Sequence, residues 1–373
     1  ENWALILQVI ALAIISIPVV YFLYCLAIVR SLSGLRGDDG KSALVRDTTI
    51  FLPMKNERRN LEAKLSEVVA EIVDYDEVNL LIVESDSNDG TAEMCTYFLD
   101  NSRLPSDRWK VVEIGGSGKS RSVNYAMNRI GDGIVIMMDT DTKASGWLEE
   151  IWSIMNKEEI GVMSGLEVPS KSNSARQRYK KSSDIVRIVE SAYGSTPVLE
   201  GGLMSWKSEA LRGFKLREGA NADDAQIALE GIRRGYKSVT YDLLRFEDTK
   251  KERGALQRSL RRAQGLSRAL LSNSDLLLRR IGFKEKIAIL NAMCTYVFVP
   301  WSVLIFCLCS PFVVSENLLH GANTFDLMNV IFFSFLFLLP QGRALGWGSS
   351  ISILSHCLLF IGKNYSIWDP GKQ

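Results

Sequence analysis

The chain has 373 residues, and its 44 Lys and Arg residues nearly balance its 43 Asp and Glu residues. This balance excludes a protein that attracts nucleic acid through its overall charge, so any basic function must reside in a local patch. With 47% hydrophobic residues and long stretches without charge, the sequence also excludes a disordered chain and a uniformly soluble globule. The length accommodates two structural units, because domains contain roughly 100–200 residues each.

Two scarce residue types narrow the possible chemistry. The only histidines, His320 and His356, lie in the apolar C-terminal part, so the polar middle lacks a histidine for a Ser-His-Asp triad or a His-bound zinc. Of six cysteines, only Cys95 lies in the polar part, which excludes a disulfide framework and a Cys-based zinc site there. We therefore expect the polar part to face a reducing compartment.

The first apolar segment, Ala4–Val29, contains 26 residues without a charge. About 20 apolar residues are enough to cross a bilayer as a helix. A cleaved signal peptide is the alternative, but its apolar region would contain only ~7–15 residues. We therefore expect a retained transmembrane helix within residues 1–30.

Three further apolar segments lie near the C-terminus. Ile287–Val314 has 28 residues without a charge and contains Pro300 and Pro311, which predict kinks. Leu327–Leu339 is short, and Ala344–Gly362 contains three glycines and a serine pair. The last two segments are either two spans, or one span and an interfacial or re-entrant helix. We therefore expect three to four spans in the chain.

Basic residues near the ends of the apolar segments predict the orientation in the membrane, because cytoplasmic loops carry an excess of Lys and Arg. Four follow the first segment and four precede the second: Arg30, Arg36, Lys41 and Arg46, then Arg279, Arg280, Lys284 and Lys286. The loop 315–324 has no Lys or Arg. We therefore expect an integral, multi-pass membrane protein with a cytoplasmic middle domain and an N-terminus outside.

Four short apolar runs rich in β-branched residues predict buried parallel strands at Thr48–Pro53, Asn79–Val83, Val111–Ile114 and Ile134–Met138. Between the first two, Asn60–Val73 has apolar residues at helical spacing. The alternation of strands and helices predicts an α/β fold with a doubly wound, mostly parallel sheet. Such sheets bind their ligands beyond the carboxyl ends of the strands.

The segments directly after these strands are therefore the candidates for a ligand site. They are Lys55–Glu57, Glu84–Thr91, Gly115–Asn124 and Asp139–Asp141. Three of the four are acidic, which suits ribose hydroxyls, a base edge and a hard cation better than bare phosphate. Gly118-Lys119-Ser120 resembles the end of a P-loop, but that motif requires a glycine five residues earlier, where Glu113 stands. An ATPase of the P-loop type is thus disfavoured.

Taken in order, these segments and several later ones resemble the inverting family 2 glycosyltransferases, which have a GT-A fold. The matching segments, within residues 47–268, are Ile50–Glu57, Glu84–Thr91, Gly118-Lys119 with Asn124, Asp139–Asp141, Gly201-Gly202 with Trp206-Lys207, Asp223-Asp224, and Arg258–Arg262. The chain departs from the family pattern at three positions. Glu84 replaces an Asp of the family pattern, and Asp223 replaces a Glu. Arg262 stands where many processive polymer synthases have Trp.

The resemblance implies a nucleotide-diphosphate-sugar donor, linked to GDP or UDP. The residues expected to bind this donor are Pro53, Glu57, Glu84, Asp86, Lys119 and Asp139. It also implies a Mn²⁺ or Mg²⁺ ion held by Asp141, with Asp139 on the ribose or metal side of the donor. Carboxylate oxygens suit these cations, whereas zinc is disfavoured where histidine is absent. For Lys119, the alternative is a solvated lysine at a helix start.

On the acceptor side, the resemblance makes Asp224 the catalytic base. The acceptor and the diphosphate would be held by Gly201, Gly202, Asp223, Arg258, Arg261 and Arg262. Asp224 would deprotonate a hydroxyl acceptor, whereas it would mainly orient a phosphate acceptor, which is already largely ionised. The alternative for Asp224 is a helix N-cap.

Two other basic segments have simpler interpretations. The arginines from Arg268 onward fit an interfacial amphipathic helix as well as a phosphate site. The run Lys171–Lys181 favours a solvated face or membrane-facing loop over a nucleic-acid site, because it contains one aromatic residue, Tyr179. We expect no nucleic-acid partner.

The expected function is a metal-dependent hexosyltransferase of the membrane-bound branch of the family. It would move a hexose, with GDP-mannose favoured by the resemblance, to a lipid acceptor such as dolichyl or polyprenyl phosphate on the cytoplasmic face. The alternative is a processive polysaccharide synthase or a glycolipid-extending enzyme of the cellulose synthase, hyaluronan synthase or ceramide glucosyltransferase type. A transporter or scaffold would place its polar sites within its spans, and these spans contain no Lys or Arg.

This interpretation divides the chain into four parts. They are a transmembrane helix at 1–30, a cytoplasmic GT-A domain at 47–250, interfacial helices with an Arg-rich box at 251–286, and a membrane region with two to three helices at 287–373.

Overall fold

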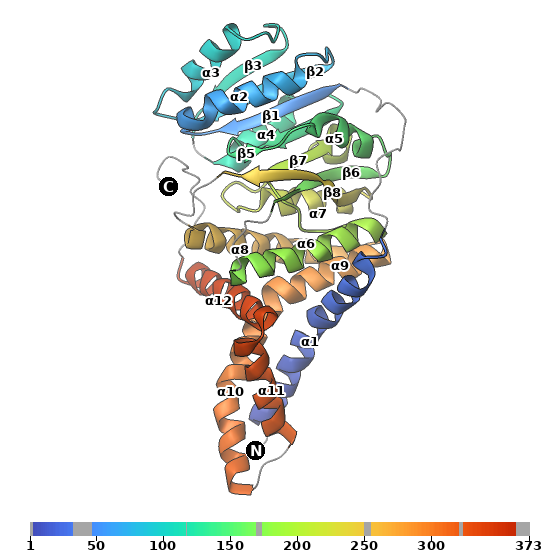
Figure 1. Ribbon diagram of the computed structural model, residues 1–373, viewed down its shortest axis with the longest axis vertical. Coiled ribbons are helices and arrows are strands. Elements are labelled where there is room, and N and C mark those ends of the chain that lie inside the picture. Colours follow the sequence, from blue (N-terminus) through green and yellow to red (C-terminus); the bar gives the residue numbers. More distant parts are fainter. Residues whose placement is uncertain are drawn as a thin grey trace.

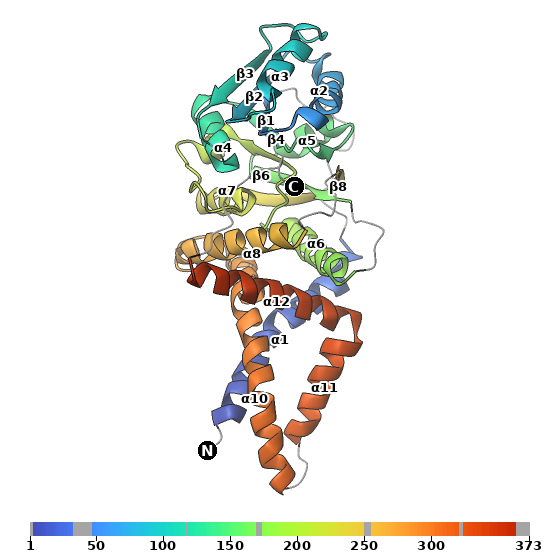
Figure 2. The ribbon, with the colours of Figure 1, turned by 90° about the vertical axis from the view of Figure 1, so that its left-hand side faces the viewer.

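The computed structural model describes residues 3–32, 47–116, 118–168, 174–249, 255–320 and 324–362. The basic residues Arg36, Lys41 and Arg46 used to predict orientation lie outside the described residues, as does Lys171. A sheet with covering helices occupies one end of the molecule, and three long helices form the other end (Figure 1). A layer of helices that run across the long axis separates the two ends (Figures 1 and 2).

The sheet has eight strands in the order β3-β2-β1-β4-β7-β6-β8-β5. The strands are β1 Thr48–Met54, β2 Val78–Ser85, β3 Trp109–Ile114, β4 Ile134–Met138, β5 Thr142–Lys143, β6 Ile160–Glu167, β7 Leu203–Lys207 and β8 Lys237–Asp248. All four apolar runs predicted as strands form β1 to β4, and these four pair in parallel. The first half of the sheet is therefore as the sequence predicts.

The second half of the sheet is mixed. Strand β7 runs antiparallel to both β4 and β6, and β5 runs antiparallel to β8, whereas β6 and β8 are parallel. The reversal of β7 brings Leu203, at its start, beside Met138, at the end of β4. As a consequence, the loop that precedes β7 reaches the same sheet edge as the residues that follow β4.

Helices cover both faces of the sheet, as the doubly wound prediction requires. The covering helices are α2 Arg58–Ile72, α3 Thr91–Asp100, α4 Lys119–Arg129, α5 Trp147–Met155 and α7 Asp223–Arg233. Alternate strand residues point to opposite faces. Ile50 accordingly packs with Leu61 of α2 and Trp147 of α5, whereas Phe51 packs with Val123 of α4.

The layer between the sheet and the long helices contains α6 Ala175–Tyr193, α8 Ala255–Ser272, α9 Phe283–Met293 and α12 Pro340–Phe360. Short 3₁₀ turns lie at Ser208–Leu211 and Ser274–Leu277. Helix α8 packs on α7 and α9 through Leu270, which is completely buried with Leu229 and Ile289. Helices α6 and α8 both lie against α12 (Figure 2).

The far end consists of α1 Trp3–Val29, α10 Val299–His320 and α11 Thr324–Leu338. In the described part of the chain, Trp3–Val29 and Phe283–Val313 are long and apolar enough to cross a membrane, and α11 with α12 would add a third span if they form one. Helices α11 and α12 meet at an angle of 87°. Whether these two helices form two spans, or one span and an interfacial or re-entrant helix, stays a prediction.

The second candidate span is irregular near Pro300, as its prolines predict. A π-helical turn, Cys294–Phe298, joins α9 to α10, and Pro311 lies within α10. Because Pro300 has no N–H, it cannot donate the helical hydrogen bond to the carbonyl of Tyr296. The Ser267 hydroxyl of α8 donates to this carbonyl at 3.5 Å.

Candidate active site

The candidate site lies at the carboxyl ends of β1, β2 and β4, where the loop before β7 and the start of α7 also converge. The central contact is the ammonium group of Lys119, at the start of α4. It lies 2.7 Å from Asp139 Oδ1 and 3.2 Å from Asp223 Oδ2, and it donates to the Gly201 carbonyl at 3.3 Å. One lysine thus joins four segments that the sequence analysis assigned to a common site.

Electrostatics explain why this lysine is stably charged. Burial lowers the pKa of Lys119, but Asp139 and Asp223 outweigh this effect and raise it. The Lys119 side chain is 15% exposed. The alternative of a solvated lysine at a helix start is therefore wrong.

The Asp224 carboxylate lies beside Gly201. A Cβ atom built on Gly201 would be 3.4 Å from Asp224 Oδ2, so a larger residue would fill the space in front of this carboxylate. Asp224 Oδ1 accepts from the N–H of Ala225 at 2.8 Å. The N-cap residue of α7 is Ala222, without a side-chain cap, so the alternative of Asp224 as the N-cap is wrong.

The environment of Asp224 raises the pKa of its carboxyl group toward neutral pH. Burial and the neighbouring charge of Asp223 raise the pKa of Asp224 to about 6, against the lowering effects of the Ala225 N–H, Lys119 and Arg262. A general base is most effective when its pKa lies close to the working pH. This raised pKa therefore suits the role of base that the resemblance predicts for Asp224.

The turn before α7 is conformationally strained. Asn221 and Ala222 have φ angles of 56° and 49°, in the left-handed region that side chains disfavour. Gly265 of α8 packs directly on this turn, where an added Cβ would lie 2.8 Å from the Ala222 nitrogen. Such strain persists only where the surroundings enforce it, and it is frequent at active sites.

The donor side is built from two loops that are bonded together. The Asn56 N–H donates to Ser87 Oγ at 2.8 Å, and the Asn88 N–H donates to Asn56 Oδ1 at 3.0 Å. The Glu57 N–H donates to Thr91 Oγ1 at 3.1 Å. These bonds fix the residues after β1 against those after β2, as the sequence analysis requires for a shared ligand.

The acids expected to bind the donor differ in exposure. Glu84 is 3% exposed, and its Oε1 accepts from the Ser87 N–H at 2.5 Å, while Glu57 is 6% exposed. Asp86 is exposed and has a φ of 59°. Pro53 is buried within β1, in register with Val83. Among the residues expected to bind the donor, Asp86 and its loop are therefore the most accessible to a ligand.

The candidate metal ligands are Asp139 and Asp141. The Asp139 N–H donates to the Gly202 carbonyl at 3.0 Å, and the Asp141 carbonyl accepts from the Thr249 N–H at 2.9 Å. No group of three or more His, Cys, Asp or Glu ligands exists among the described residues. The two carboxylates alone fit a hard cation that takes its remaining oxygen ligands from a bound diphosphate and water.

Three arginines of α8 face this site to different degrees. Arg258 is buried, at 9% exposure. Burial and the nearby Arg262 lower the pKa of Arg261, against the raising effects of Asp223 and Asp139. Arg262 is exposed, and its positive charge acts to lower the pKa of Asp224 and of Glu200. The Arg-rich box thus adds positive charge beside the acid pair.

A comparison with known proteins identifies the domain. Residues 49–212 match the family model described as glycosyl transferase family 2. These residues belong to glycosyltransferase family 2. The protein is therefore a glycosyltransferase, and the predicted family and enzyme class are confirmed. No curated protein sequence matches the chain.

One solved structure in particular shows that this glycosyltransferase has the predicted GT-A-like fold. The chain is similar to the mannosyltransferase PcManGT from Pyrobaculum calidifontis, solved with GDP-Man and Mn²⁺, with 20% identity, a TM-score of 0.76, and 96% of this chain and 99% of the other covered. TarS from S. aureus, residues 1–349 with UDP-GlcNAc, matches with 12% identity, a TM-score of 0.49, and coverage of 85% and 92%. Glucosyl-3-phosphoglycerate synthase from Mycobacterium tuberculosis matches with 18% identity, a TM-score of 0.42, and coverage of 61% and 81%.

The glycosyltransferase also has an ion-pair network next to Gly201 and Gly202 that was not predicted from the sequence. Lys180 of α6 lies 2.9 Å from Glu200 and 3.3 Å from Glu167, while Arg187 pairs with Asp184 at 3.1 Å and with Glu200. The expectation of a solvated face for the Lys171–Lys181 run is wrong for Lys180, whose side chain is 16% exposed. The spacing of Lys180, Asp184 and Arg187 on one helical face was the available signal.

Proposed function

We propose that the protein transfers a hexose from a nucleotide-diphosphate sugar to a phosphate-bearing membrane lipid, with inversion at the sugar. The observation that carries this proposal is the Lys119 contact, which holds the ends of the donor and acceptor segments together at Asp139 and Asp223. The family match supports the sugar transfer, and the similar mannosyltransferase solved with GDP-Man supports a GDP-linked mannose donor.

In this mechanism, an acceptor oxygen attacks the anomeric carbon as the bond to the diphosphate breaks. With a hydroxyl acceptor, Asp224 takes the proton as the new glycosidic bond forms, and the nucleoside diphosphate leaves with the electron pair of the broken bond. With a phosphate acceptor the attacking oxygen is already ionised, so Asp224 mainly orients it. The absence of a side chain at Gly201, beside Asp224, would leave room for the acceptor.

The diphosphate that leaves carries negative charge, which positive groups must stabilise. Lys119 supplies one such charge, and we assign Arg258, Arg261 and Arg262 to the diphosphate or the acceptor phosphate, because arginine binds phosphate through two parallel hydrogen bonds. Asp141 and Asp139 would hold Mn²⁺ or Mg²⁺, as the oxygen-only ligand set favours. When bound, the cation neutralises phosphate charge without proton transfer.

Glu57, Glu84 and Asp86 are assigned to the nucleoside, with Pro53 shaping the strand end behind them. The burial of Glu84 and its bond to Ser87 favour a role in holding the loop that contacts the donor. In the same proposal, Gly201 and Gly202 form the acceptor wall, and Asp223 holds Lys119 in place.

The position of the site relative to the apolar helices supports the proposal of a lipid acceptor. Helix α8, which carries the arginines, packs against α9 and α12, next to the candidate spans (Figure 2). A lipid phosphate at the membrane surface would reach these arginines first. We assign the catalytic domain to the cytoplasmic side and the N-terminus to the other side, on the distribution of Lys and Arg.

A donor and acceptor panel tests this function. The purified protein, with Mn²⁺, is offered GDP- and UDP-linked hexoses, and release of the nucleoside diphosphate is measured with and without farnesyl phosphate. Nucleotide release that depends on farnesyl phosphate, with a product that bears a single sugar, supports the proposal. A product of high molecular mass would favour polymer synthesis instead, and the absence of nucleotide release from every donor would contradict the proposal.

A further inference from the structure

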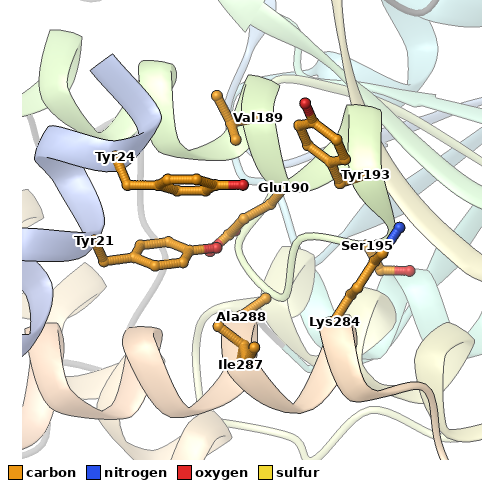
Figure 3. A pocket seen from close by; sticks show the side chains of 9 residues that line it. All are labelled: Tyr21, Tyr24, Val189, Glu190, Tyr193, Ser195, Lys284, Ile287 and Ala288. Atoms are coloured by element: carbon orange, nitrogen blue, oxygen red, sulfur yellow. The ribbon is translucent and has the colours of Figure 1, made fainter. Parts of the chain in front are cut away.

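A cavity of about 310 Å³ lies where α1, α6 and α9 meet (Figure 3), and none of its lining residues is assigned to sugar transfer. Its polar lining consists of Tyr21, Tyr24, Glu190, Tyr193, Ser195 and Lys284. The three elements come from distant parts of the sequence, so the cavity exists only in the folded protein. The rest of the lining is apolar, which suits a ligand with a polar head and an apolar body.

The base of the cavity holds a buried carboxyl group. Glu190 is 6% exposed, and its Oε1 has no hydrogen-bond partner in the described part of the protein. The Tyr21 ring extends from α1 toward this carboxyl (Figure 3). Burial raises the pKa of Glu190 to about 8, although Thr196, Tyr21, Asn291 and Arg187 act to lower it. At neutral pH the group is therefore mostly protonated and can donate a hydrogen bond.

The mouth of the cavity holds a cation. The Lys284 ammonium lies over the Tyr193 ring, 5.6 Å from its centroid, and no ion pair joins it to a carboxylate of the described residues. The neighbouring Glu285 accepts a hydrogen bond from Ser195 at 3.5 Å, and Arg187 behind the cavity pairs with Asp184 and Glu200. With Glu190 protonated, Lys284 is the charged group that lines the cavity.

Exposed tyrosines, a residue type common at membrane surfaces, lie at the rim of the cavity. Tyr24 and Tyr193 are 54% and 46% exposed, whereas Val189 and Ala288 behind them are buried. Tyrosine is enriched at the depth of lipid headgroups. Tyr21 and Tyr24 lie in the last third of α1, an apolar helix long enough to cross a bilayer. A headgroup beside α1 could therefore enter from the side.

We propose that this cavity binds the phosphate headgroup of a membrane lipid, at a site separate from the sugar-transfer site. Lys284 supplies the positive charge, the tyrosine hydroxyls and the Glu190 carboxyl supply hydrogen-bond donors, and the apolar lining accommodates the start of the acyl or prenyl chain. The proposal depends on α1 lying in a membrane and does not depend on the transferase activity. It can therefore be tested without a nucleotide sugar.

Binding is measured on the full-length protein in detergent, by thermal unfolding followed through tryptophan fluorescence as each lipid is titrated. The probes are dioctanoyl phosphatidylglycerol, farnesyl phosphate and dioctanoylglycerol, which has no phosphate. The two phosphate lipids should raise the unfolding temperature and dioctanoylglycerol should not. Tighter binding of phosphatidylglycerol would assign the site to bilayer phospholipid, and tighter binding of farnesyl phosphate that Lys284→Ala weakens would assign it to a prenyl phosphate. Equal stabilisation by dioctanoylglycerol would overturn the proposal.

Two lysines of α9 provide a matched pair of variants. Lys284→Ala should weaken binding of phosphatidylglycerol about fivefold, which is typical for one lysine near a lipid surface. Lys286→Ala, two residues along the same helix and outside the cavity lining, should leave it unchanged. The unfolding temperature without lipid shows whether each variant is folded. Equal effects of the two substitutions would contradict a site at this cavity.

Glu190 provides a second, independent test, because phosphatidylglycerol keeps the same charge across the pH range used. As pH rises from about 6.5 to about 9, Glu190 loses its proton, and the new negative charge should weaken binding. Glu190→Gln stays neutral, so it should bind as tightly at the higher pH as at the lower. If the wild type and this variant lost affinity in parallel, Glu190 would not contact the phosphate and the proposal would fail.

Discussion

Gly265 of α8 lies directly against the backbone of Ala222, the residue that precedes the acid pair at the start of α7. A Cβ at position 265 would approach the Ala222 nitrogen to 2.8 Å, and Ala222 has a φ of 49°. Because residue 265 has no side chain, α8 can pack directly against the strained turn that precedes α7. This turn sets the direction in which Asp223 and Asp224 enter the site.

We expect Gly265→Ala to lower activity more than tenfold without unfolding the protein. Alanine stabilises a helix interior by about 1 kcal/mol relative to glycine, so helix propensity alone predicts a more stable variant. The contact with Ala222 should instead displace Asp224. The kcat and the unfolding temperature of the variant are compared with those of Gln257→Ala, an exposed position on the same helix. Wild-type kcat in Gly265→Ala would show that the contact does not position the acids.

Removing the charge of Asp223 and removing that of Lys119 should shift the pH profile of activity in opposite directions. Because the pKa of Asp224 is about 6, activity with a hydroxyl acceptor should rise as pH increases through this value. Asp223 raises the pKa of Asp224, so Asp223→Asn should move the acidic limb to lower pH. Lys119 lowers it, so Lys119→Gln should move the limb to higher pH. The measurement is kcat/KM against pH for the three proteins, and shifts in the same direction would contradict this assignment.

Asp141→Ala should abolish the dependence of nucleotide release on Mn²⁺ and weaken binding of the ion itself. Asp141 is 6% exposed and lies just after the end of β4, and the described residues offer no group of three or more His, Cys, Asp or Glu that could replace it. Calorimetric titration with Mn²⁺ in the presence of the nucleoside diphosphate measures binding without turnover. Glu150→Ala, which removes an exposed acid of α5 outside the candidate site, is the control. Equal Mn²⁺ affinity in wild type and Asp141→Ala would place the metal elsewhere.

Gln8→Leu should lower the stability of the helical end without a direct effect on the site. The Gln8 amide donates to Ser310 Oγ at 2.9 Å and to Asn329 Oδ1 at 3.0 Å, so one side chain joins α1, α10 and α11. Hydrogen bonds between membrane helices contribute about 0.6 kcal/mol on average, up to about 1.7 kcal/mol. A reduced unfolding temperature with unchanged KM for the donor is expected. Gln257→Ala again serves as the control.

Local patterns were sufficient to predict the first half of the sheet and the convergence of the candidate site segments at one edge. Strands β1 to β4 are continuous apolar runs, and the polar residues that follow them are adjacent in space because parallel strands end at one edge. The antiparallel β7 was not predicted, since its neighbours β4 and β6 are distant in sequence. The partners of Glu200 were missed for the same reason. Lys180 and Arg187 approach it only because α6 packs beneath the loop before β7.

The role of Asp224 separates the two classes of acceptor. Asp224→Asn keeps the size of the side chain and removes its capacity to accept a proton, so transfer to a hydroxyl acceptor should fall by roughly 10²–10⁴-fold. Transfer to farnesyl phosphate should fall much less, because that oxygen is already ionised and needs only orientation. Initial rates with both acceptors are measured at saturating donor. Glu209→Gln, an acid of the 3₁₀ turn after β7, controls for a general effect of charge. An equally severe loss with both acceptors would mean that Asp224 acts on the donor, and the base would then have to be sought in Asp223.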